Sequence, residues 1–210
     1  MQNTAKRYVI SQFANPRGPV GLLAGLIMVR RPSNQRRNLW TLELMEVAAG
    51  DRVLEIGYGP GFALQNLLKR NSKIRVVGID RSKTMHWMAK FLNHVAVKSG
   101  RAKLLVGSIE ELEKKSVVPL DGPFSKIYSI NTAMFWRKPV ETFSLLRSCL
   151  SPDGKIYITY QPRVGEKTDA AALASAAKIK DQMLAASYSD VRLELCKELS
   201  PVAVCLIGSV

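Results

Sequence analysis

Short apolar runs alternate along most of the chain with segments whose apolar residues have helical spacing. Runs that are typical of buried strands cover residues 52–57, 74–79, 103–106, 126–130 and 155–160, and two further runs cover residues 191–196 and 202–207. Helical spacing fills residues 61–69, 82–98, 109–115, 139–150 and 168–187. Regular alternation of strands and helices is typical of a mostly parallel sheet that is covered on both faces. The pattern therefore predicts an α/β fold in which the last two strands form a closing pair.

Local signals set several boundaries within this pattern. The Ser82 hydroxyl is placed to accept a bond from an unpaired backbone N–H, so we expect it to cap one long helix over residues 82–98. Pro139 opens a helix at a position where a missing N–H costs no hydrogen bond. Residues 151–154 read Ser-Pro-Asp-Gly, which predicts a turn before the strand at 155–160.

The N-terminal segment lies outside the alternation. We expect a single domain over residues 1–210, with residues 1–40 as an N-terminal lid or substrate-binding extension. The apolar run at residues 18–29 is too short to span a bilayer, and Arg30-Arg31-Pro32 follows where a signal peptide needs small residues. A mobile apolar cover over a pocket fits this run. A helix packed on the sheet edge, or a contact with a membrane surface, stays open as an alternative.

The chain is strongly basic. It carries 31 Lys and Arg against 17 Asp and Glu, a formal net charge of +14. Such a charge attracts nucleic acid, anionic lipid or acidic small molecules without choosing among them, and it also fits a surface that is merely solubilising. Basic residues are scattered, with local density only near residues 30–37, so no nucleic-acid-binding arm is indicated.

Cysteines and histidines give no sign of a metal site. The three cysteines, Cys149, Cys196 and Cys205, form no CxxC pair, which suits a reducing cytoplasm and thiols packed as small apolar groups. The two histidines, His86 and His94, belong to no ligand cluster. We therefore expect no metal centre and a cytoplasmic protein.

The most informative stretch is a glycine loop directly after the first predicted strand. Gly57, Gly59 and Gly61 alternate there, which allows a tight turn and close approach of a ligand to the backbone. Phe62 stands where a dinucleotide-binding fingerprint has its last glycine, and the Gly-Lys-Ser/Thr ending of a phosphate-binding P-loop is absent. Glu55 would repel a pyrophosphate but would favour a ligand that carries an ammonium or a sulfonium group.

These residues carry a resemblance to a known family. The segment Glu55-Ile-Gly57-Tyr-Gly59-Pro-Gly61 resembles the first motif of class I, Rossmann-like S-adenosylmethionine-dependent methyltransferases of the small-molecule type. Asp80, at the end of the second strand, matches the ribose-binding acid of the second motif, and the resemblance covers residues 51–160. It implies a three-layer sandwich with a mostly parallel seven-stranded sheet and a closing antiparallel strand, and S-adenosylmethionine as the cofactor.

The resemblance also implies a cofactor site. Ser108 departs from the family, which often has an acidic residue or Asn in that loop, so a weaker adenine contact is expected there. The expected cofactor-binding residues are Glu55, Gly57, Tyr58, Gly59, Gly61, Asp80, Arg81, Ser108, Ile109 and Asn131.

The acceptor is less clearly indicated. The [DN]PP[FYW] motif of exocyclic-amine enzymes is absent, since the loop reads Asn131-Thr-Ala-Met-Phe135, and no cysteine lies in an active-site loop. These absences favour a small-molecule or lipid acceptor over nucleic acid. We expect acceptor contacts from Tyr8, Phe13, Met28, Phe135, Trp136, Tyr160 and Arg163.

No catalytic residue is assigned from the sequence. Methyl transfer from an activated sulfonium needs alignment more than a dedicated base, and a lone helical histidine such as His86 is more often a solvated or core residue. An RNA methyltransferase, or a Rossmann-like nucleotide-binding protein of another class, stays open as an alternative. The acceptor, the methylated atom and the oligomeric state are not indicated.

Overall fold

The computed structural model describes residues 16–114, 122–163 and 165–210, so the predicted acceptor residues Tyr8 and Phe13 lie outside the described part. Its centre is a seven-stranded sheet in the order β3-β2-β1-β4-β5-β7-β6. The strands are β1 Arg52–Ile56, β2 Arg75–Asp80, β3 Ala102–Val106, β4 Phe124–Ile130, β5 Leu150–Tyr160, β6 Ser189–Cys196 and β7 Ala203–Ser209. Strands β1 to β5 are mutually parallel, and β7 runs antiparallel to both of its neighbours. The predicted fold class is confirmed.

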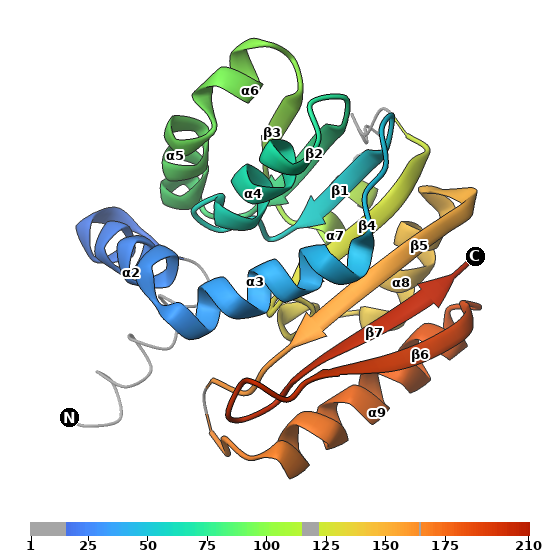
Figure 1. The fold of residues 1–210 in the computed structure, drawn as a ribbon. Helices are drawn as coiled ribbons and strands as arrows, with labels where there is room; N and C mark the ends of the chain where they lie inside the picture. The colour runs from blue at the N-terminus through green and yellow to red at the C-terminus, as the bar shows by residue number, and fades with distance from the viewer. Residues whose placement is uncertain (1–15, 115–121, 164) are drawn as a thin grey trace.

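Helices cover both faces of the sheet (Figure 1). They are α2 Gly18–Arg30, α3 Pro32–Met45, α4 Phe62–Arg70, α5 Lys83–Leu92, α6 His94–Lys98, α7 Ile109–Lys114, α8 Pro139–Ser148 and α9 Asp169–Ala185, with a short 3-10 helix η1 at Ala133–Phe135. One apolar cluster joins α3, α4, α5 and α6 to one face of the sheet, and a second joins α7, α8 and α9 to the other. Adjacent residues of a strand enter different clusters, as Val53 and Leu54 do, because side chains alternate across a sheet.

Two predicted elements are wrong in detail. The single helix expected at 82–98 is divided at Asn93, whose side-chain amide donates to the backbone carbonyls of Ala89 and Gly61. The expected cap is present, since Ser82 Oγ accepts from Met85 N at 3.1 Å. The turn expected at 151–154 lies within β5, which begins at Leu150 and has an irregular register opposite Phe124 and Lys126.

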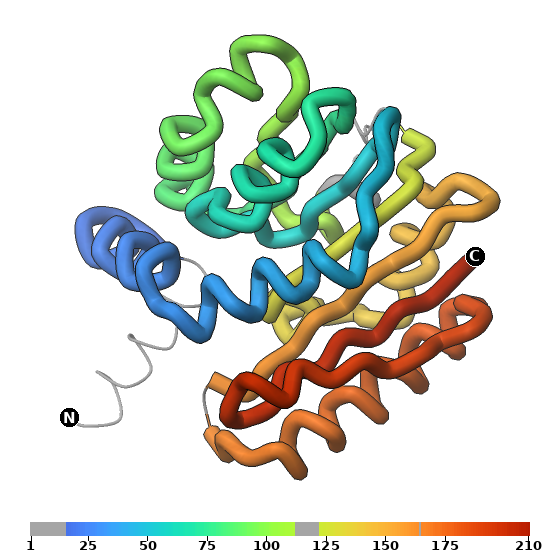
Figure 2. Tube along the Cα trace, in the orientation of Figure 1, coloured from blue at the N-terminus to red at the C-terminus, as the bar shows by residue number. Residues whose placement is uncertain are grey.

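Helix α2 lies beyond the carboxyl ends of the parallel strands, and α3 runs from that end back over one face of the sheet (Figure 2). Helix α3 was not predicted, and the boundary expected near residue 40 falls inside it. Its buried residues Arg37, Trp40, Thr41 and Met45 follow helical spacing, and Thr41 Oγ1 lies 2.8 Å from Thr159 Oγ1 of β5. The N-terminal part of α3 is thereby fixed near the end of the sheet at which parallel α/β folds bind ligands.

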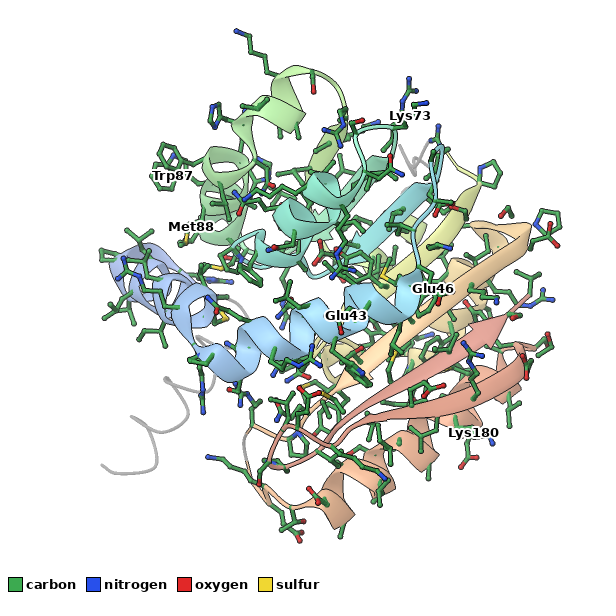
Figure 3. The ribbon with its side chains drawn as sticks, in the orientation of Figure 1. Glu43, Glu46, Lys73, Trp87, Met88 and Lys180 are labelled. Carbon is green, nitrogen blue, oxygen red and sulfur yellow. The ribbon has the colours of Figure 1, made fainter. Side chains whose placement is uncertain are left out.

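Helix α2 packs on α5 through a small residue. A Cβ on Gly25 would lie 2.5 Å from Met88 Sδ, so a larger residue there would require the methionine side chains of α5 to shift, and Figure 3 shows Met88 on the side of α5 that faces α2. Leu23 and Ile27 of α2 are exposed. No helix in the described ranges combines the length and apolarity needed to cross a membrane.

Candidate active site

A cavity of about 380 Å³ opens at the carboxyl ends of β1 to β4. Its walls come from the loops that follow these strands, from η1, from α2 and α3, and from the loop after β5. Ligands of parallel α/β sheets bind in this position because the strand order reverses there, between β1 and β4. The topology therefore gathers residues from six separate parts of the chain around one space.

The glycine loop forms one wall, and its three glycines meet different surroundings. All three have positive φ angles, +79° at Gly57, +52° at Gly59 and +85° at Gly61. A Cβ at Gly57 would lie 2.2 Å from Thr132 Oγ1, and a Cβ at Gly61 would lie 2.9 Å from Ala89 Cα, whereas a Cβ at Gly59 would meet no atom within 4 Å. Gly57 and Gly61 are thus required by packing, and Gly59 faces open space where the loop lines the cavity.

Asp80 holds the glycine loop to the next strand. Its Oδ2 accepts from Gly59 N at 2.8 Å, and its Oδ1 accepts from Ser82 N at 2.8 Å. Burial raises the pKa of Asp80, and the two backbone N–H donors oppose this rise. Each carboxylate oxygen keeps a second lone pair, so Asp80 can still accept bonds from a ligand's hydroxyl groups.

Glu55 is a buried acid with an unmet bonding capacity. Only 3% of the residue is exposed, and its Oε2 has no hydrogen-bond partner in the described part of the chain. Burial raises the pKa of the Glu55 carboxyl to about 8; the Asp80 charge adds to the rise, and the Tyr128 hydroxyl opposes it. A cationic group beside Oε2 would satisfy this carboxylate and favour its ionised form.

Tyr58 points its ring away from the ligand side of the loop. Its hydroxyl donates to the Leu105 carbonyl at 3.0 Å and lies 2.9 Å from His86 Nδ1. Because a phenol has one proton, both contacts are satisfied when Nδ1 of His86 carries hydrogen and donates to Tyr58. Burial lowers the pKa of His86, and the positive charge of Lys90 adds to this. The pair ties the glycine loop to α5 and β3.

The opposite wall is built around buried arginine. Arg37 is 5% exposed; its Nη1 donates to Gln161 Oε1 at 2.7 Å and its Nη2 to Asn34 Oδ1 at 3.1 Å. Its Nε has no partner among the described residues. Arg163 also donates to Asn34 Oδ1 and, at 3.1 Å, to Ser33 Oγ. Arg31 lines the cavity beside them.

Most of the predicted site residues meet around this cavity. Those that line it are Glu55, Gly57, Tyr58, Gly59, Asp80, Arg81, Ser108, Ile109, Asn131, Met28, Phe135, Trp136 and Arg163. Gly61 lies behind the loop against α5, and Tyr160 packs with the apolar cluster under α8 and α9. The Asn131 side chain bonds to the Gln161 backbone through both Nδ2 and Oδ1, so it joins the ends of β4 and β5.

Sequence reasoning missed the residues that α3 contributes to the site. Asn34, Arg37 and Asn38 line the cavity but were not expected there. Pro32 at the first helical turn and the helical spacing through Trp40 and Met45 would have indicated the helix. They would not have indicated that Arg37 is buried, because arginine is rarely buried without a partner.

Comparison with known proteins identifies the family. A family model described as a methyltransferase domain matches residues 48–196, more than half of the chain. The chain belongs to this methyltransferase family. It is also 31% identical over 186 residues to an uncharacterized methyltransferase, YdaC, of Bacillus subtilis, covering 88% of this chain and 96% of the relative. The resemblance to class I S-adenosylmethionine-dependent methyltransferases is thus confirmed.

Solved structures show the same fold at low identity. The [4+2]-cyclase SpnF has a TM-score of 0.66 and 14% identity, over 84% of this chain and 81% of SpnF. A phosphoethanolamine N-methyltransferase of Haemonchus contortus has a TM-score of 0.64 and 17% identity, over 83% of this chain and 52% of that one. The pyocyanin biosynthetic protein PhzM has a TM-score of 0.62 and 13% identity, over 87% and 60%. Because one of these is named as a cyclase, fold alone does not give the reaction.

Proposed function

We propose that this methyltransferase transfers a methyl group from S-adenosylmethionine to a small-molecule acceptor, with both held in the cavity beyond β1 to β5. The observation that carries the proposal is the buried carboxyl of Glu55. Its Oε2 has no hydrogen-bond partner among the described residues, and it lies at the cavity beside the glycine loop. A cationic ligand fits this arrangement and a pyrophosphate does not. Two fold neighbours, one in complex with phosphomonomethylethanolamine and one a pyocyanin biosynthetic protein, support a small acceptor.

The residues present fit the cofactor. Glu55 would hold its positive charge, Asp80 its ribose hydroxyls through the free lone pairs, and Ser108 and Ile109 its adenine edge. When bound, S-adenosylmethionine supplies an activated methyl group on a good leaving group, so no protein nucleophile is needed. The chain's own residues bind, orient and exclude water.

The acceptor is expected on the far side of the glycine loop. Thr132, Met134 and Phe135 line the cavity just after β4, and Met28 of α2 lines it as well. These side chains offer an apolar surface that keeps water from the reacting atoms, while Arg37 and Arg163 supply polar contacts further along the sheet.

The first test is direct binding of the cofactor. We expect calorimetry to show micromolar binding of S-adenosylmethionine and S-adenosylhomocysteine, with no binding of NAD. Asp80→Asn should weaken both by about tenfold or more, because charge-assisted bonds to ribose hydroxyls are lost. Asp181→Asn, an exposed acid on α9, is the charge-matched control and should bind as the native chain does. Binding of NAD in place of the sulfur ligands would refute the proposal.

Phe135 offers a test of the acceptor side. The ring is 37% exposed at the cavity and has Arg81 above it, 5.3 Å from guanidinium carbon to ring centroid. We expect Phe135→Ala to raise the KM for the acceptor by about tenfold, because a buried aromatic contact is worth roughly 1–2 kcal/mol. Turnover can be followed as S-adenosylhomocysteine release with a panel of phosphorylated and carboxylated amines and phenols.

The control for Phe135 is Phe91→Ala, an exposed ring on α5 that stacks on Trp87 away from the cavity. Trp136 is a poorer probe, because it packs edge-on against Phe143 in the core, with ring centroids 5.0 Å apart. Equal losses of acceptor affinity and S-adenosylhomocysteine affinity in Phe135→Ala would mean that Phe135 contacts the cofactor and not the acceptor alone.

A further inference from the structure

A group of three arginines lines the cavity without an acidic partner. Arg31, Arg37 and Arg163 all border it, and no carboxylate within the described ranges forms an ion pair with any of them. Residues 1–15 contain no Asp or Glu in their sequence. In the described part of the chain, the hydrogen bonds of Arg37 and Arg163 go to neutral oxygens, those of Asn34, Gln161 and Ser33.

Arg37 is the most constrained member. The residue is 95% buried, its two Nη atoms are held by Gln161 and Asn34, and its Nε has no partner among residues 16–114, 122–163 and 165–210. Gln161 is itself fixed, since its Nε2 donates to the Pro201 carbonyl at 2.7 Å and its Oε1 is thereby turned toward Arg37. Burial lowers the pKa of Arg37 to about 9, and the positive charges of Arg163 and Arg31 add to this. A buried cation held rigidly among like charges is costly unless an anion completes the site.

The position of the group separates it from the expected cofactor site. Gln161 and Arg163 follow β5, while the glycine loop follows β1, and β4 lies between these strands. Neighbouring strands are about 4.8 Å apart, so the two ends of the cavity are on the order of 10 Å apart across the sheet. An anionic group bound by the arginines would lie on the acceptor side of the cavity.

We propose that Arg37 and Arg163, with Arg31 at the rim, form an anion-binding subsite that selects acceptors carrying a carboxylate or phosphate group. The guanidinium groups of Arg37 and Arg163 both donate to one amide oxygen, that of Asn34, so the two groups lie close together at the cavity. Planar guanidinium groups in this arrangement match the paired oxygens of such anions. This inference rests on the proposed function and names the substrate class for the same cavity.

The test uses inorganic phosphate as the probe, titrated into the protein saturated with S-adenosylhomocysteine. We expect phosphate to bind, and to raise the Tm more than sodium chloride of equal ionic strength, because only the native state holds the site. Arg37→Met and Arg163→Met should each weaken phosphate binding by about tenfold or more. Arg163 lies outside regular secondary structure, so its variant remains informative even if Arg37→Met folds poorly.

The matched control is Arg36→Met. Arg36 is the neighbour of Arg37 on α3, but it points outward and pairs with Glu43 and Glu198. Its variant loses the same charge and should bind phosphate as the native chain does. Equal responses of all four proteins, or no phosphate effect beyond that of chloride, would overturn the subsite.

A second measurement separates the acceptor from the cofactor as the source of the anion. The affinity for S-adenosylhomocysteine should change less than twofold in Arg37→Met and Arg163→Met. If both variants lose that affinity while 5′-methylthioadenosine, which lacks the amino-acid end, binds normally, the arginines hold the cofactor's carboxylate and the acceptor assignment is wrong. Failure of the native chain to bind S-adenosylhomocysteine at all would refute the proposed function, and the acceptor subsite with it.

Discussion

Replacement of Glu55 by glutamine should stabilise the unliganded protein at pH 9 and at the same time weaken its binding of S-adenosylmethionine. The native carboxyl has a pKa of about 8, while its value in an unfolded chain is 4.5. Below pH 4.5 both states are protonated, and the full stability is present. Between pH 4.5 and 8 the unfolded state loses its proton while the folded state keeps it, so stability falls as the pH rises.

The expected difference is large. Each unit of pKa shift corresponds to about 1.4 kcal/mol, so the native chain loses on the order of 4 kcal/mol through this one group, and Glu55→Gln does not. Urea unfolding of both chains at pH 5 and pH 9 measures it. All other titrating groups are common to the two chains, so the difference between the two pH profiles reports Glu55. Parallel profiles would show that Glu55 ionises normally in the fold.

Folding of the unliganded protein favours the protonated carboxyl of Glu55, whereas binding of a cationic ligand should favour the ionised carboxyl. A fixed positive charge beside Oε2 favours the ionised carboxyl, so native protein at pH 6.5 should release up to about one proton as S-adenosylmethionine binds. Calorimetry in buffers of different ionisation enthalpy measures this release. Glu55→Gln should release none and should bind about tenfold or more weakly. The native chain would then give up stability at Glu55 in order to bind a cation.

The sheet could be predicted from the sequence because its signals are local. Runs such as residues 52–57 and 74–79 are mostly apolar, and the helices between them carry one apolar face. A buried parallel strand needs no partner-specific residue to be recognised. The glycine loop and Asp80 follow strand ends directly, so their meeting at one edge of the sheet also follows from topology.

The remaining features depend on contacts between distant parts of the chain. The break at Asn93 exists because its amide reaches Gly61, 32 positions earlier in the chain. Arg37 is buried because Gln161, 124 positions away, supplies an acceptor for it. Neither partner is visible from the local sequence, in which Asn93 continues a helix and Arg37 belongs to a polar, arginine-rich segment.

Alanine substitutions in the glycine loop should have the second large effect. Gly61→Ala should mainly lower the stability of the fold, and Gly59→Ala should mainly weaken ligand binding. A methyl group at position 61 would lie 2.9 Å from Ala89 Cα and 2.7 Å from Asn93 Nδ2, with φ at +85°. Backbone cannot yield as a side-chain end can, so α5 must move away from the loop. Left-handed strain and overpacking together should lower the free energy of unfolding by roughly 2–5 kcal/mol.

Gly59→Ala should instead affect ligand binding. A methyl group there meets no atom within 4 Å, so only the positive φ of +52° costs stability, about 1 kcal/mol. The same methyl group stands where the loop lines the cavity, so S-adenosylhomocysteine binding should fall by about tenfold or more. Gly50→Ala is the matched control: it has a φ of +92° and open space around the new methyl group, but it lies outside the cavity lining.

Urea unfolding and calorimetry on the three variants then separate packing from binding. Gly50→Ala and Gly59→Ala should unfold alike, while Gly59→Ala alone of these two loses ligand affinity. Gly61→Ala should have a lower free energy of unfolding than either of these variants. If Gly59→Ala bound S-adenosylhomocysteine as tightly as Gly50→Ala does, the ligand would not approach the loop at its second glycine, and the alternating glycines would serve only the turn from β1 into α4.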